Sequence, residues 1–70
     1  MSIFRDIAYK RLWDYGFSVE THPDIFDVSV HHEEILKSDI EAIKDILWAS
    51  NCDYHYIRKI EDNTVRITLK

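Results

Sequence analysis

The chain has 70 residues, of which 46% are hydrophobic and 13% aromatic, and its formal net charge is −4. This length and composition predict one compact globular domain, residues 1–70, and exclude an intrinsically disordered chain. The acidic balance makes nucleic acid an unfavourable main partner, because nucleic-acid-binding proteins carry a basic surface.

The cysteine content and the apolar runs bear on the compartment. A single cysteine, Cys52, excludes an intrachain disulfide and fits a reducing environment. No apolar run approaches the ~20 residues of a membrane span, and the first residues lack the pattern of a signal peptide. We therefore expect a cytoplasmic protein that has no membrane partner.

The first predicted element is a helix from about Ile3 to Tyr15. Ser2 can cap its start, and Gly16 follows at the position where a helix end requires positive φ. Apolar side chains recur along one side at ~100° per residue. We expect this side to pack on the core through Phe4, Ile7, Ala8, Leu12 and Tyr15.

Two alternating segments follow, 17–22 and 25–31, separated by Pro23-Asp24. Proline is pre-set for the first corner of a tight turn, so the pair predicts a β-hairpin. A two-residue turn at this point pairs Val19 with Val28 and Thr21 with Phe26, and directly paired residues share one face of a sheet. The expected core face of the hairpin is Phe17, Val19, Thr21, Phe26, Val28 and Val30.

The clearest helix runs from Ser38 to Ser50. Ser38 and Glu41 have the spacing of a capping box, in which each side chain accepts from the other residue's backbone N–H. Asn51 then offers a left-handed residue at the helix end. The apolar stripe of this helix consists of Ile40, Ile43 and Leu47.

A second hairpin is predicted from segments 52–60 and 65–70, with Asp62-Asn63 at its turn. An uninterrupted ladder pairs Ile60 with Val65, Arg58 with Ile67 and Tyr56 with Leu69. The expected core side is then Cys52, Tyr54, Tyr56, Ile60, Val65, Ile67 and Leu69. The opposite side would carry His55, Ile57, Lys59, Arg66 and Lys70, while Arg58 would have to run its stem along the core.

The order α-β-β-α-β-β predicts an α+β fold of two layers, a four-stranded antiparallel sheet with both helices on one face. The strand order stays open. The two halves, 2–31 and 38–70, match weakly at an offset of 35 residues. The matching positions are Leu12-Trp13 with Leu47-Trp48, and Gly16 with Asn51.

Sites for metal, cofactor or catalysis are not indicated. Adjacent strand residues point to opposite faces, so His31 and His32 cannot bind one ion there, and Cys52 and His55 are likewise opposed. Gly16 is the single glycine, which excludes a glycine-rich phosphate loop. We expect no metal, no cofactor and no enzyme activity. A small hydrolase or nuclease using His22, His31 or His55 beside a carboxylate is the remaining catalytic alternative.

The strongest functional signal lies on the first helix. Tyr9 and Trp13 are four residues apart, so they are neighbours on the side opposite the expected core face, and Arg5 and Lys10 flank them. Exposed tryptophan, tyrosine and arginine are typical of binding hot spots. The alternative is structural, with Trp13 covering a sheet edge or packing against the connection 32–37.

These observations favour a small intracellular protein-binding module that acts as a regulator or inhibitor. It would occlude a surface of a larger protein, with Arg5, Tyr9, Lys10 and Trp13 as the contact patch. Regulators encoded by phages and mobile elements are often of this size and charge, and the module would act as a monomer or homodimer. The alternative is a nucleic-acid-binding accessory protein that uses the open face of the sheet.

Overall fold

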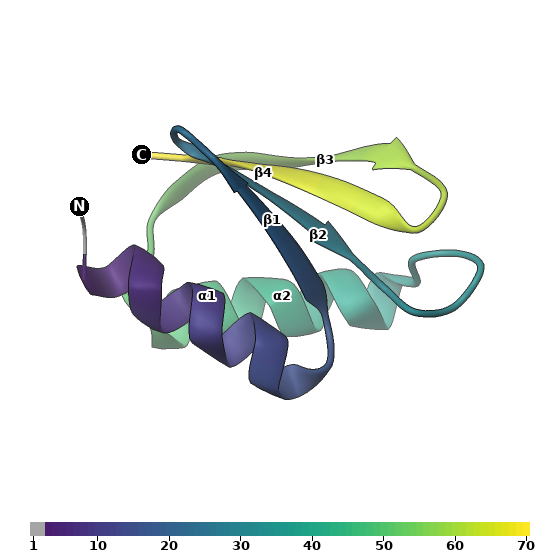
Figure 1. The fold of residues 1–70 in the computed structure, drawn as a ribbon, viewed down its shortest axis with the longest axis horizontal. Helices are drawn as coiled ribbons and strands as arrows, with labels where there is room; N and C mark the ends of the chain where they lie inside the picture. The colour runs from purple at the N-terminus through teal and green to yellow at the C-terminus, as the bar shows by residue number, and fades with distance from the viewer. Residues whose placement is uncertain (1–2) are drawn as a thin grey trace.

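The computed structural model describes residues 3–70, so the expected Ser2 cap lies outside the described residues. The elements in chain order are α1 (Ile3–Tyr15), β1 (Ser18–His22), β2 (Ile25–Ser29), α2 (Lys37–Ala49), β3 (Tyr54–Glu61) and β4 (Thr64–Leu69). All strands pair antiparallel in the order β1-β2-β4-β3, and both helices lie on one face of this sheet (Figure 1). The expected two-layer α+β fold is confirmed.

The core lies between the sheet and the helices. Each helix contributes two fully buried side chains at a spacing of four residues, which are Ala8 and Leu12 in α1 and Ile43 and Leu47 in α2. Burial of one such leucine or isoleucine stabilises the fold by roughly 1.5–3 kcal/mol. The sheet faces them with Val19, Phe26, Val28, Val65, Ile67 and Leu69.

Helix α1 ends in a Schellman motif. The N–H of Gly16 donates to the carbonyl of Trp13 at 3.1 Å, and the N–H of Phe17 donates to the carbonyl of Leu12 at 3.1 Å. Gly16 has a φ of 119°, a conformation that favours glycine, as expected. Phe17 and Leu12 are both buried, which supplies the apolar contact that accompanies this motif.

Helix α2 ends in the same way, 35 residues later. Asn51 has a φ of 54°, and its backbone N–H donates to the carbonyl of Trp48 at 3.1 Å. The backbone N–H of Cys52 donates to the carbonyl of Leu47 at 2.9 Å. Arg11 of α1 also donates to the carbonyl of Ala49 at 3.0 Å, placing positive charge at the negative end of the α2 dipole. The matching residues therefore make matching hydrogen bonds.

The start of α2 differs from the expected capping box. The helix begins at Lys37, and Leu36 is its N-cap with an extended backbone. The carboxylate of Asp39 accepts from the backbone N–H of Leu36 at 2.8 Å, so Asp39 takes the role that was expected of Glu41. The prediction of Ser38 and Glu41 as the box was wrong because Asp39 is already placed three residues after the N-cap.

The first hairpin has the expected register. His22 pairs with Ile25, Thr21 with Phe26 and Val19 with Val28. Asp24 has a φ of 59° in the two-residue turn. The expected core residues of this hairpin are buried except Thr21, which is exposed near the turn.

The expected register of the second hairpin was wrong. Glu61 pairs with Thr64 across the turn, but Lys59 then pairs with Val65, because the ladder shifts at Ile60. One inserted residue exchanges the two faces of the strand. Ile57 therefore packs against the core and Arg58 lies opposite Arg66 on the open face of the sheet.

The shift also moves the second-hairpin side chains that were expected in the core. Tyr56 is 56% exposed, and Ile60 is half-buried where the ladder shifts. Cys52 is buried and Tyr54 is partly buried against the core, as expected. A second irregularity between Tyr54 and Tyr56 explains why these two tyrosines differ.

The core-facing side of α1 was also predicted incorrectly in part. Ala8 and Leu12 are buried as expected, but Phe4, Ile7 and Tyr15 are exposed. Apolar residues occur all round this helix, so its periodicity selects no single side. Tyr15 instead stacks on Phe17, with ring centroids 5.1 Å apart.

The register shift can be tested by comparing Ile57→Ala with Tyr56→Ala in urea unfolding. Because Ile57 contacts the core, we expect its truncation to lower the free energy of unfolding by about 1–2 kcal/mol. Tyr56→Ala should cost less than about 0.7 kcal/mol, since its ring is mostly exposed. A larger loss for Tyr56→Ala would support the uninterrupted ladder and contradict the observed one.

Candidate functional site

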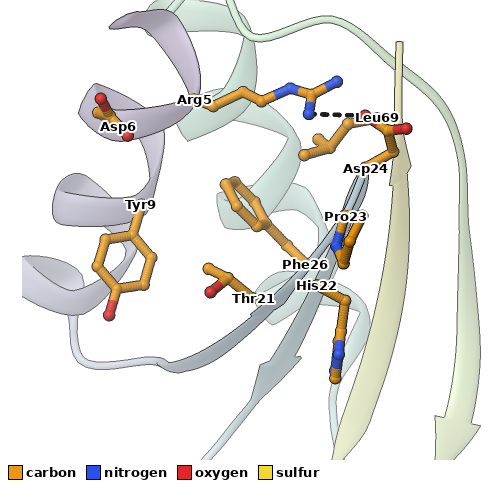
Figure 2. A pocket seen from close by; sticks show the side chains of 9 residues that line it. All are labelled: Arg5, Asp6, Tyr9, Thr21, His22, Pro23, Asp24, Phe26 and Leu69. Carbon is orange, nitrogen blue, oxygen red and sulfur yellow. Dashed lines mark hydrogen bonds and ion pairs between the residues drawn. The ribbon is translucent and has the colours of Figure 1, made fainter. Parts of the chain in front are cut away.

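A hollow of about 490 Å³ separates the first half of α1 from the turn between β1 and β2. Figure 2 shows α1 side chains on one side and side chains from the hairpin opposite them. We call this feature the α1–turn hollow. It is lined by Arg5, Asp6, Tyr9, Thr21, His22, Pro23, Asp24, Phe26 and Leu69.

Tyr9 links the hollow to Trp13. Its ring lies 6.3 Å from that of Trp13 at an interplanar angle of 72°, and 6.3 Å from that of Phe26 at 48°. Phe26 is buried, so the three rings form a series that begins in the core and ends at the surface. Tyr9 was expected opposite the core, but it lies beside the core-facing side because that side runs through Ala8 and Leu12.

Tyr9 and Trp13 nevertheless keep large exposed areas, 37% and 45%. Trp13 also lines a shallower hollow together with Ser18, Val19 and Glu20 of the edge strand β1. The side chain of Trp13 therefore lies at a sheet edge, as the structural alternative requires, while much of its ring stays open to a partner. Covering an edge and offering a contact surface are compatible roles for this residue.

Arg5 connects three parts of the chain. Its guanidinium donates to the carboxylate of Asp24 at 2.9 Å and to the carbonyl of Lys70 at 2.6 Å, and Figure 2 shows it reaching across to the turn. These contacts hold α1 to the first hairpin and to the end of β4. The side chain of Lys10 is exposed and makes no ion pair or hydrogen bond within residues 3–70. Of the four residues predicted as a contact patch, Arg5 is therefore engaged within the chain, whereas Tyr9, Lys10 and Trp13 keep exposed surface.

The open face of the sheet carries a charged network beside the hollow. Arg66 donates to both carboxylate oxygens of Asp27, at 2.8 and 3.0 Å. The imidazole of His22 lies 3.3 Å from Asp27 and 3.3 Å from Glu20. Hydrogen bonding from Arg66 lowers the pKa of Asp27 although burial opposes this, so the carboxylate is ionised at neutral pH. A carboxylate held ionised by an arginine is poorly suited to general acid–base catalysis.

His31 and His32 each contact one local partner, His55 is exposed, and Cys52 is buried. His31 contacts the hydroxyl of Ser18 at 3.0 Å, and His32 contacts Asp39 at 2.9 Å. Burial raises the pKa of the Cys52 thiol, which disfavours the reactive thiolate. Within residues 3–70, no three histidine, cysteine or carboxylate side chains are grouped to hold a metal ion. Over the same residues, neither helix has the length and apolar character needed to cross a membrane.

Comparisons with protein families, with curated proteins and with solved structures found no match.

Sequence reasoning missed the hairpin side of the α1–turn hollow, formed by Thr21, Pro23 and Phe26. The Pro23-Asp24 turn indicated a tight hairpin, but no sequence pattern placed that turn opposite Arg5 and Tyr9. Trp48, which follows directly after Leu47 of the α2 apolar stripe, is the most exposed of the large hydrophobic side chains described, at 84%.

The Asp27–Arg66 pair predicts how stability depends on pH. The native pKa of Asp27 is lowered by its pairing with Arg66. The contribution of this pair to the free energy of unfolding is therefore present above the unfolded pKa of about 3.9 and is lost as the pH falls through the native pKa. We expect Asp27→Asn to reduce stability at pH 7 by about 1–2 kcal/mol. The difference from wild type should shrink progressively below about pH 4, as measured by urea unfolding at several pH values.

Glu20→Gln is the matched control, because Glu20 neighbours the same histidine but is exposed. Glu20→Gln should change the free energy of unfolding by no more than about 0.5 kcal/mol over the same pH range. A difference between wild type and Asp27→Asn that stayed constant down to pH 2 would contradict the assigned role of the Asp27 carboxylate.

Proposed function

We propose that the protein is a small binding module that covers a surface of a larger protein through Tyr9, Trp13 and the α1–turn hollow. The observation that carries this proposal is the ring series from buried Phe26 through Tyr9 to exposed Trp13. Aromatic side chains that are held by packing lose little conformational entropy on binding, which favours their use as anchors.

The lining of the hollow indicates what the partner inserts. Tyr9, Pro23, Phe26 and Leu69 give it apolar walls. Its charged side chains include Arg5, which already pairs with Asp24. We therefore expect an apolar side chain of the partner to enter the hollow, while the exposed face of Trp13 packs beside it. The module would act by steric occlusion and would need no chemistry of its own.

The test compares Trp13→Ala with wild type as bait in affinity capture from native lysate, followed by titration of the purified captured protein. We expect Trp13→Ala to change the melting temperature by less than about 5 °C, because Trp13 is 45% exposed and lies outside the buried core. Its affinity for the captured protein should fall at least about tenfold, as for a hot-spot residue.

Ile7→Ala is the matched control on the same helix. Ile7 has the same exposed fraction as Tyr9, 37%, but it does not line the hollow. The control should bind with unchanged affinity. Equal binding by Trp13→Ala and wild type would exclude the proposed surface, and a fall in melting temperature above about 10 °C would show that Trp13 is a structural residue.

A second candidate function is binding of single-stranded nucleic acid on the open sheet face. One observation favours it: the register shift places exposed Tyr56 on this face, in the row next to Arg58 and Arg66. An aromatic ring beside arginines can stack a base and contact a phosphate. Arg66 is already paired with Asp27, and Glu20 lies in the same row, which weakens the positive potential of this face.

This candidate predicts a salt-dependent anisotropy change with labelled single-stranded RNA or DNA at low ionic strength. Tyr56→Ala and Arg58→Ala should each reduce binding at least about threefold, because each removes a stacking or phosphate contact. Lys10→Ala, which removes an exposed positive charge from α1, should bind like wild type. No signal at 20–50 mM salt (roughly the range in which phosphate contacts are strongest) would rule the candidate out.

A further inference from the structure

Trp48 forms a second surface that the proposed function does not use. Its side chain is 84% exposed, and within residues 3–70 no aromatic ring or cation is stacked on it. It occupies the same place in the Schellman motif of α2 as Trp13 does in α1. Trp13 has Tyr9 four residues before it, whereas Trp48 has Lys44, so only Trp13 is supported by a second ring.

The surroundings of Trp48 are defined by a shallow hollow of about 290 Å³ between α2 and the start of β3. Trp48 and Tyr54 provide aromatic surface in this lining, while Asp45 and Asp53 provide carboxylates. Neither carboxylate makes an ion pair within the part of the chain that the structure describes. Lys44 is the single positive side chain of the lining, so the local charge is negative.

We infer that the Trp48 hollow binds an arginine side chain of a protein partner. Tryptophan is the aromatic residue that attracts cations most strongly, and a guanidinium can stack on its ring while it donates to carboxylates. Charge complementarity supports this choice, since the lining has two carboxylates against one ammonium and the whole chain has a net charge of −4.

The Trp48 hollow is separate from the α1–turn hollow, and the two share no lining residue. Binding in the Trp48 hollow therefore does not require the proposed role of Trp13. A partner that used both would contact the two flanks of the helical layer, one beside β1 and the other beside β3. Each contact has its own variant, so failure of one leaves the other testable.

The experiment titrates the isotope-labelled full chain with acetyl-Gly-Arg-Gly-amide and follows amide and indole N–H signals by NMR. The matched probe contains citrulline, a neutral analogue of arginine with the same shape. We expect the arginine peptide to shift the Trp48 indole signal and the backbone signals of Asp45 and Asp53. The citrulline peptide should produce no comparable shift, because it lacks the positive charge.

Three variants test which side chains of the Trp48 hollow bind the arginine peptide. Trp48→Ala should abolish the localised response and, because the ring is exposed, leave the remaining spectrum folded. Asp45→Asn combined with Asp53→Asn should weaken binding about threefold or more, while Lys44→Gln should strengthen it about twofold, since one removes attraction and the other removes repulsion.

Several results would overturn the inference. Equal shifts with citrulline would show apolar stacking without charge recognition. Shifts of similar size at every exposed carboxylate would show a nonspecific ionic effect. An equal response to a third probe, acetyl-Gly-Lys-Gly-amide, would remove the assignment to arginine. Self-association of the protein through Trp48, measured by sedimentation and accompanied by loss of the peptide-induced shifts, would assign the surface to a second copy of the chain.

Discussion

Strands β2 and β4 pair at the centre of the sheet and join the first half of the chain to the second. On the helix side, Phe26 pairs with Ile67 and Val28 with Val65, and all four are buried. Two polar contacts align on the opposite side, between Asp27 and Arg66 and between the hydroxyls of Ser29 and Thr64. The same pairing thus builds the core and satisfies the polar groups of the sheet's outer face.

The first hairpin was predictable because its turn and its apolar alternation specify one register. Pro23-Asp24 fixes a two-residue connection, and the pairs that follow from it bring Val19 to Val28 without interruption. The second hairpin has an equally recognisable turn, but the inserted residue at Ile60 has no sequence marker such as glycine. An uninterrupted ladder would place Arg58 on the core side, and this unfavourable position indicated that such a ladder was incorrect.

The candidate site was predictable only in part, for a similar physical reason. The four-residue spacing of Tyr9 and Trp13 indicated that their rings would meet, and they do. The contact of Tyr9 with Phe26 depends on how α1 is oriented over the sheet, and apolar residues all round the helix leave that orientation undetermined. Arg5 was expected to face a partner, but the chain end and the turn converge on it, and such long-range contacts have no local sequence signal.

The two helix ends show how related local structures can acquire different surroundings. Both use the carbonyls of a Leu-Trp pair to bind the residues that follow, so the backbone fixes the direction in which each tryptophan leaves its helix. Beside Trp13 the neighbouring ring is tyrosine, whereas the lining around Trp48 is charged. The same backbone motif therefore presents a tryptophan supported by a second ring at one flank and an unsupported tryptophan among charged side chains at the other.

The irregularities of β3 affect more than the register of the second hairpin. Strand β3 is the longest strand and lies at the edge of the sheet, where unpaired backbone groups form a template for strand addition and aggregation. The ladder shifts twice within its eight residues, near each end, and each shift bends the strand and breaks the regular spacing of its free N–H and C=O groups. Arg58 and Lys59 add adjacent positive charges between the shifts, next to the second one. A chain that exposes this much aromatic surface thereby gains protection against growth into an extended ribbon at its longest free edge.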